Sequence, residues 1–204
     1  EVDSMYLQTL KMLKANYKDN EVVTEIDYKI ALLYNEQANK FKPLEGSEYQ
    51  WKRKEAFEIC KTVITDYPKS SGAEKCKSLQ SEILNPSLQI TTEKIVPIHK
   101  PARLLVTYKN TDHLYFTAFI ISKGQERKFN EIYEESKRIE FIQKLKAVKT
   151  WNTQLKNESD YQQHINEVLL PELGAHSYMI FASTDESISE ENTYGYTFVQ
   201  VSDI

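Results

Sequence analysis

Cysteine and histidine are the residues in this sequence that could most readily do chemistry, because thiolates and imidazoles act as nucleophiles, bases and metal ligands. The chain has two cysteines and four histidines, namely Cys60, Cys76, His99, His113, His164 and His176. No His-Glu-x-x-His motif occurs, and no two histidines have the spacing of ligands on one helix. Neither cysteine has a nearby cysteine or histidine at zinc-ligand spacing. We therefore expect no metal site.

The motifs of common enzyme sites are missing as well. The chain has only 5 glycines and contains no Gly-x-Ser-x-Gly elbow, no Gly-x-Gly-x-x-Gly and no Gly-Lys-Ser. The carboxylate pairs Glu134-Glu135 and Glu190-Glu191 lie in polar stretches typical of a solvated face. A Ser-His-Asp triad is recognised in space rather than by spacing, so the sequence leaves it open. We expect no catalytic residue, no cofactor and a protein that is not an enzyme.

Composition limits the partners. Of the 204 residues, 40% are apolar and 27% charged, which is typical of a folded globular chain. The net charge of −4 argues against nucleic acid, which selects basic surfaces. No apolar run reaches the roughly 20 residues of a membrane-spanning helix. The first residues, 1–4, carry neither a methionine nor a signal segment, so we expect a processed chain or a piece of a longer one.

The first 85 residues carry apolar side chains at the three- and four-residue spacing of amphipathic helices. Helices are predicted over residues 5–18, 24–41, 47–66 and 71–84. Ser47 and Gln50 have the spacing of a capping box at the start of the third helix. Pro68 follows the end of that helix, and Asn85-Pro86 closes the helical part, because a residue before proline avoids helical geometry.

After Pro86 the apolar period changes from 3.6 to 2, which predicts strands. Seven are expected, over residues 88–91, 102–109, 113–122, 146–155, 161–169, 176–183 and 194–201. Residues 125–146 return to a helical pattern and predict a helical insertion. The predicted fold class is α+β, with antiparallel helical hairpins over 1–85 and a seven-stranded antiparallel β-sandwich over 86–204.

The two cysteines are placed for a disulfide. Cys60 and Cys76 lie on the inward faces of two predicted helices, eight residues on either side of Pro68. In an antiparallel helix pair these positions face each other, so the two Cα atoms can come within the roughly 4.4–6.8 Å that a disulfide requires. The alternative is two buried free thiols. A disulfide would indicate an oxidising compartment.

Part of the helical half resembles a tetratricopeptide repeat. Ala56, Cys60, Val63 and Pro68 follow the spacing of the second helix of that repeat, in which small residues allow close packing and a proline ends the helix. The preceding helix departs from the pattern, so a degenerate array of helical hairpins is the resulting expectation.

The β half resembles a macroglobulin domain. In the string 170–178, Pro171, Leu173 and Tyr178 match a Pro-x-Leu-x-x-Gly-x-Tyr corner in which the tyrosine hydroxyl ties the turn, although His176 stands where glycine is usual. The final residues 198–204 look like the junction between successive domains of that family. The whole chain resembles the N-terminal region of a bacterial alpha-2-macroglobulin-like protein, of the long secreted kind seen in Bacteroidetes.

This resemblance implies a large extracytoplasmic protein, in the periplasm or at the cell surface, often lipid-anchored and able to trap proteases. The family's reactive Cys-x-Glu-Gln thioester is absent here, since Lys61 follows Cys60 and Lys77 follows Cys76. The chain itself would be scaffold, with other domains of the parent chain, proteases or envelope proteins as partners. The alternative is a peptide- or glycan-binding module, which Trp51 or Trp151 lining one groove would favour.

Overall fold

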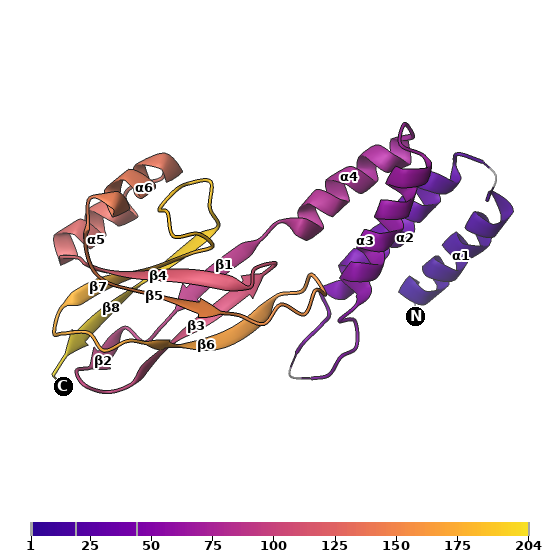
Figure 1. Cartoon of the computed structure of the whole chain (residues 1–204). Helices are drawn as coiled ribbons and strands as arrows, with labels where there is room; N and C mark the ends of the chain where they lie inside the picture. Colours follow the sequence, from indigo (N-terminus) through magenta and orange to yellow (C-terminus); the bar gives the residue numbers. More distant parts are fainter. Residues whose placement is uncertain (1, 19, 44, 204) are drawn as a thin grey trace. The chain divides into compact units, whose positions relative to one another are not determined.

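The computed structural model describes residues 2–18, 20–43 and 45–203 and divides the chain into two compact units. The helical unit comprises Glu1–Asn85 together with Glu158–Gln162. The sandwich unit comprises Pro86–Asn157 and Gln163–Ile204. Figure 1 shows the helices and strands of each unit. The chain thus passes between the units three times, and the short segment Glu158–Gln162 belongs to the helical unit although it lies between two strands in the sequence.

The described part of the helical unit contains four helices. They are α1 (Val2–Asn16), α2 (Val23–Ala38), α3 (Lys52–Asp66) and α4 (Ser71–Leu84). The predicted capping box is wrong, because α3 begins at Lys52 rather than near Ser47. Tyr49, between them, has a positive φ of 64°, which a right-handed helix does not allow. Ser70 instead caps α4, where its hydroxyl accepts a hydrogen bond from the Ala73 amide at 3.1 Å.

Small residues let α2, α3 and α4 approach one another closely. Ala31, Ala56, Cys60, Ala73 and Cys76 are completely buried in the core of the unit. Two helix pairs are described here, whereas a stable repeat array usually needs three or more repeats. A tetratricopeptide array therefore stays a prediction.

Gly72 marks the closest approach in this unit. A Cβ atom at Gly72 would lie 2.6 Å from the backbone and Cβ of Thr24 on α2. We expect Gly72→Ala to lower the free energy of unfolding by about 2 kcal/mol, because overpacking outweighs the higher helix propensity of alanine. Urea unfolding followed by circular dichroism measures this. Gly124→Ala, where the nearest atom is 4.0 Å away, is the control and should be neutral or stabilising; equal effects at both sites would contradict the prediction.

The described residues of the sandwich unit form eight strands in two sheets. The strands are β1 (Ser87–Thr91), β2 (Ile95–Pro97), β3 (Ala102–Lys109), β4 (His113–Ile120), β5 (Lys146–Gln154), β6 (His164–Leu170), β7 (Ser177–Ser183) and β8 (Tyr194–Ser202). One sheet has the order β1-β3-β6 and the other β2-β8-β7-β4-β5. The predicted count of seven and the purely antiparallel pairing are therefore wrong. The missed strand β2 pairs parallel to β8 and has only three residues, too few to show an alternating pattern.

The main core of this unit fills the space between the two sheets. Alternate side chains of β3 point into it, and Leu104, Val106 and Tyr108 are buried. Phe116 of β4 and Ile180 of β7 meet them from the five-stranded sheet. The unit is therefore a β-sandwich, as the alternating sequence pattern predicts.

The predicted helical insertion is two helices rather than one. They are α5 (Lys123–Asn130) and α6 (Glu135–Gln143), separated by a short break. Ser122 and Gln125 form a capping box that starts α5. Both helices contribute to a second core on the outer face of the five-stranded sheet, where Phe129 and Ile142 are fully buried. That sheet is consequently covered on both faces.

The stability of the second core should depend on pH through Tyr194, which packs against it. Burial, together with the Glu135 carboxylate, raises the pKa of Tyr194 to about 12 from an ordinary value of 10.0. The folded chain thus holds the phenol proton more tightly, so this stabilisation is complete below about pH 10 and is lost as the pH rises towards about 12. Tyr194→Phe has no phenol proton to lose, so the variant should not show this decrease in stability at high pH. Its urea midpoint should therefore rise relative to wild type between about pH 8 and about pH 11; an unchanged difference would contradict the prediction.

Candidate functional site

The predicted cysteine pair is brought together in the structure. Cys60 of α3 and Cys76 of α4 are buried, unbonded thiols in the same core cluster of the helical unit. The neighbouring Cys76 side chain and burial raise the pKa of the Cys60 thiol, whereas the Cys60 side chain lowers the pKa of Cys76. Both thiols are completely buried, and a buried thiol is inaccessible to a substrate, so the geometry does not favour a reactive cysteine here. The disulfide stays a prediction.

The corner residues of the sandwich unit lie between β6 and β7. The Tyr178 hydroxyl donates a hydrogen bond to the Gly174 carbonyl at 2.9 Å, and burial raises the pKa of Tyr178. Leu173 is buried and Pro171 half-buried beside it. His176 packs edge-on against the Tyr178 ring, with 6.1 Å between the ring centroids. The last residue of the presumed domain junction, Ile204, lies outside the described residues.

The histidines are spread over the sandwich unit and do not converge. His99 pairs with Glu172, and the rings of the other three pack on tyrosines. These contacts join His113 to Tyr115, His164 to Tyr108 and His176 to Tyr178. Over residues 2–18, 20–43 and 45–203, no three histidine, cysteine or acidic side chains are grouped so that they could hold a metal ion.

The most elaborate polar site is the one around the clasp, as we term Glu158–Gln162, in the helical unit. Its Asp160 and Gln162 side chains are only 1% and 4% exposed. Burying polar side chains so completely is unfavourable unless they find hydrogen-bond partners. The partners come from the end of α2, the loop after it and α3.

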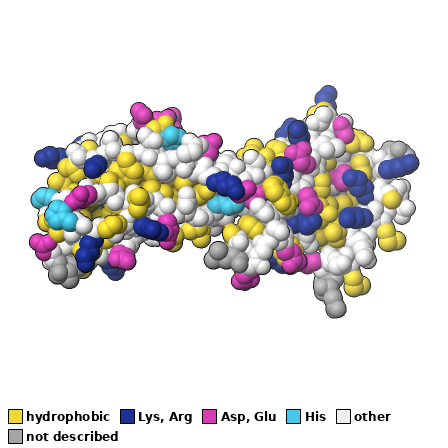
Figure 2. Space-filling model, turned by 60° about the horizontal axis from the view of Figure 1, so that its bottom comes forward, with side chains coloured by type: hydrophobic (Ala, Val, Ile, Leu, Met, Phe, Trp, Pro, Cys, Tyr) yellow, Lys and Arg dark blue, Asp and Glu magenta, His cyan; other side chains and the backbone are white. Residues whose placement is uncertain are grey.

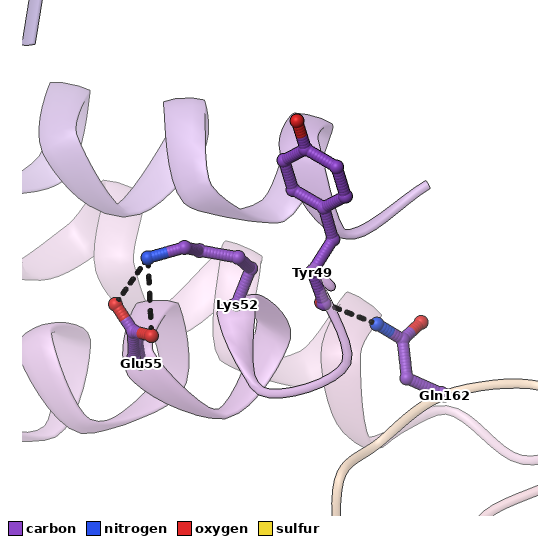
Figure 3. Close-up of polar contacts among 4 residues, drawn as sticks. All are labelled: Tyr49, Lys52, Glu55 and Gln162. Atoms are coloured by element: carbon purple, nitrogen blue, oxygen red, sulfur yellow. Dashed lines mark hydrogen bonds and ion pairs between the residues drawn. The ribbon is translucent and has the colours of Figure 1, made fainter. Parts of the chain in front are cut away.

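Gln162 binds three backbone carbonyls. Its side-chain amide donates to the carbonyl oxygens of Ala38 at 3.2 Å, Tyr49 at 3.2 Å and Gln50 at 3.1 Å. Figure 3 shows the contact with Tyr49, beside the Lys52–Glu55 ion pair on the first turn of α3. Ala38 is the last residue of α2, and its carbonyl also accepts a hydrogen bond from the Phe41 amide at 3.2 Å, as the Tyr49 carbonyl does from the Lys52 amide at 3.2 Å. Gln162 thus adds side-chain hydrogen bonds to carbonyls at the end of α2 and in the following loop.

Asp160 and Arg53 hold the rest of the clasp. The Asp160 carboxylate accepts hydrogen bonds from the Gln50 side-chain amide at 3.0 Å and from the Gln162 backbone amide at 2.9 Å. Arg53 of α3 donates to the Tyr161 carbonyl at 3.3 Å and to the side chain of Asn35 at 3.1 Å. Burial lowers the pKa of Arg53, while the carboxylates of Glu82 and, to a smaller extent, Asp160 act in the opposite direction. The guanidinium therefore lies in a partly buried network with opposite charge nearby.

An aromatic contact completes the site. The Tyr161 ring packs against Phe57 of α3 with 5.0 Å between the centroids, a favourable tilted geometry. Ser159 and Tyr161 both have positive φ, at 55° and 60°. For residues with a side chain, that conformation costs roughly 1–2 kcal/mol each. The surrounding contacts must offset this strain for the clasp to keep its shape.

The local sequence pattern does not reveal this site. It predicts a strand over residues 161–169, whereas β6 begins at His164. The run Asn157-Glu158-Ser159-Asp160 is rich in turn-forming residues and was the available signal for an irregular segment. The burial of Asp160 and Gln162 depends on partners more than a hundred residues earlier in the chain, and a local pattern does not reveal such partners.

The two tryptophans belong to different units, Trp51 to the helical unit and Trp151 to the sandwich unit. Trp51 is 44% exposed, and the ammonium group of Lys54 lies 5.3 Å from its ring centroid. Trp151 packs flat on Phe116 in the sandwich unit, with 5.1 Å between centroids. A shallow hollow of about 310 Å³ lies next to Trp151, and its polar and aromatic lining is Tyr115, Thr117, Thr150, Asn152 and Glu186.

The remaining surface features are the distribution of charged side chains and the exposed apolar side chains. Basic and acidic side chains lie interspersed on the face drawn in Figure 2, without a large basic patch on that face. Helix α1 presents an uncovered apolar side formed by Met5, Tyr6, Met12 and Leu13, with Met5 70% exposed. Among the described residues, no helix is both long and apolar enough to cross a membrane.

Comparisons with known proteins give structural likenesses only. No protein-family model matches the sequence, and no curated protein matches it. Native alpha-2-macroglobulin from Escherichia coli, spanning domains MG0-NIE-MG1, aligns with a TM-score of 0.36 and 18% identity over 58% of this chain and 40% of that chain. The CARDB domain of the PF1109 protein from Pyrococcus furiosus, solved in complex with di-metal ions, aligns with a TM-score of 0.32 and 15% identity over 58% and 88%. Scores this low do not define a family.

Proposed function

We propose that the chain is a non-enzymatic scaffold and interaction module of a larger extracytoplasmic, alpha-2-macroglobulin-like protein. The corner of Pro171, Leu173 and Tyr178 in a β-sandwich supports the macroglobulin part of this proposal. A degenerate tetratricopeptide-like helical part, a Bacteroidetes-type lipid-anchored parent and protease trapping in that parent are its finer elements. They rest on the sequence resemblance.

The observation that carries the scaffold proposal is the clasp. A segment between β5 and β6 of the sandwich unit supplies Asp160 and Gln162 to the interior of the helical unit. The helical unit is therefore completed by residues that the sandwich sequence brings. Because part of the helical unit lies within the sandwich sequence, we expect the two units to unfold cooperatively, which suits a scaffold between further domains.

One tryptophan in each unit allows a direct test. In Trp151→Phe the remaining Trp51 reports on the helical unit, and in Trp51→Phe the remaining Trp151 reports on the sandwich unit. We expect both reporters to give the same urea midpoint in the otherwise intact chain. Replacing residues 158–162 by glycine and serine should lower the midpoint seen by Trp51 and leave that of Trp151 in place. Two separate transitions that this replacement does not alter would refute the scaffold proposal.

The non-enzymatic part has its own test. The intact chain is incubated with a panel of ester, peptide, phosphate and glycoside substrates, and we expect no turnover. Turnover that a single side-chain substitution abolishes would identify an enzyme and overturn this part of the proposal.

A ligand-binding module is the second candidate function, and two observations favour it. The clasp is a short irregular segment held by the helical unit, which favours a peptide as ligand. The hollow beside Tyr115 and Asn152 combines an aromatic ring with hydroxyl, amide and carboxylate groups, and this combination suits a glycan. Glycan-array binding that Tyr115→Ala and Asn152→Ala abolish would support the glycan form, and an array without hits would exclude it for the glycans tested.

A further inference from the structure

We propose that the surface of the helical unit that holds the clasp is a recognition site for short peptides of the type Asp-aromatic-Gln, and that the clasp occupies this site in cis. The inference deepens the peptide-binding candidate above and rests on it. It assigns a ligand chemistry to named residues, namely Gln50, Arg53 and Phe57 together with the carbonyls of Ala38 and Tyr49.

The site is built from one continuous part of the helical unit. Its groups lie between Asn35 and Phe57, at the end of α2, in the following loop and on α3. The clasp is separated from them by more than a hundred residues and contributes no helix or strand. The interaction therefore has the form of a short irregular peptide bound to a folded surface, although both belong to one chain.

Each clasp residue is recognised in a different way. The Gln162 side chain meets three carbonyl acceptors, which select a neutral amide donor and disfavour a carboxylate. The Asp160 side chain meets the Gln50 amide donor, with the Arg53 guanidinium as the nearby positive charge. Arg53 also binds a main-chain carbonyl, that of Tyr161, which fixes the peptide backbone without reading a side chain.

The middle position selects an aromatic ring. Tyr161 packs on Phe57, and its pKa is raised by burial and by the nearby Glu58 carboxylate. The tyrosine is therefore neutral as it packs. A peptide with an aromatic residue between an aspartate and a glutamine matches all three subsites. A peptide that lacks the glutamine side-chain amide loses its hydrogen bonds to the buried Ala38 carbonyl and the partly buried carbonyls of Tyr49 and Gln50.

Occupation in cis regulates such a site. A tethered ligand has an effective concentration of roughly millimolar, so a free peptide competes poorly while the clasp is in place. The left-handed conformations of Ser159 and Tyr161 work against the bound clasp, because the free chain does not need them. The resting chain is therefore closed to peptide, and displacement of the clasp opens it.

Fluorescence anisotropy with a labelled peptide tests the proposal. The probe is a synthetic peptide with the sequence of residues 156–164, and the protein is the full chain in which residues 158–162 are replaced by glycine and serine. We expect saturable binding, at least about ten-fold tighter than to the wild-type chain. The same peptide carrying Gln162→Ala, or the clasp-replaced chain carrying Arg53→Ala, should bind at least about ten-fold more weakly. A scrambled peptide is the matched control.

Two results would overturn the proposal. One is a clasp-replaced chain that keeps its helical circular dichroism and does not bind the peptide; the other is equal binding of the scrambled peptide. If that chain does not fold, Gln162→Ala in the otherwise intact chain takes its place, since it weakens the clasp without removing it. That variant should bind the peptide more tightly than wild type, and no increase would also overturn the proposal. A negative result leaves the scaffold proposal standing, because the tryptophan reporters test it separately.

Discussion

Phe129→Ala should lower the free energy of unfolding of the sandwich unit by about 3–5 kcal/mol, the usual cost of removing a fully buried phenylalanine. Phe129 of α5 is completely buried. Its ring packs edge-on against Tyr196 and Phe198 of β8 and tilted against Phe141 of α6. The Arg138 guanidinium lies 5.7 Å from the ring centroid. Alanine would leave a cavity between the inserted helices and the sheet, which neighbours on two sides can fill only in part.

Urea unfolding followed by Trp151 fluorescence measures this effect, because Trp151 lies in the sandwich core. The matched control is Tyr133→Ala, in the same insertion, since Tyr133 is 92% exposed. It should change stability by less than about 0.5 kcal/mol. If the two substitutions cost the same, the helical insertion is not part of the cooperative core of the sandwich unit.

Oxidation of Cys60 and Cys76 to a disulfide should raise stability by about 3 kcal/mol, the chain-entropy value for a loop of about 15 residues. The two thiols are buried in the same core cluster of adjacent helices, so a bridge between them would close the α3–α4 hairpin. The oxidised chain should therefore unfold at higher urea than the same chain in reductant. Protein secreted into an oxidising compartment, unfolded without reductant, should show no free thiols.

The comparison needs a control in which no bridge can form. The double variant Cys60→Ala and Cys76→Ala should have the same urea midpoint with and without reductant. Two free thiols in the secreted, unreduced protein would contradict the prediction. That result would also remove the main support, within the chain itself, for the proposed extracytoplasmic location.

Local sequence patterns determined most elements of this protein. The apolar stripe of residues 71–84 predicts α4 with its observed ends, and the alternation of residues 102–109 predicts β3 with its observed ends. Such patterns succeed because a side chain every third or fourth residue, or every second one, must face a core whatever the neighbours are. They fail where the element is too short, as in β2, or where a backbone turn decides its start, as at Tyr49 before α3.

The burial and hydrogen bonding of the clasp depend on the tertiary structure alone. Asp160 and Gln162 are polar residues in a polar segment, and nothing in their neighbourhood distinguishes them from loop residues exposed to solvent. They are buried because Gln50 and the carbonyls of Ala38 and Tyr49 lie where these side chains end. Those partners are brought close by the folding of α2 and α3. A hydrogen bond between distant residues depends on both positions in space, and this is information that no single segment of the chain contains.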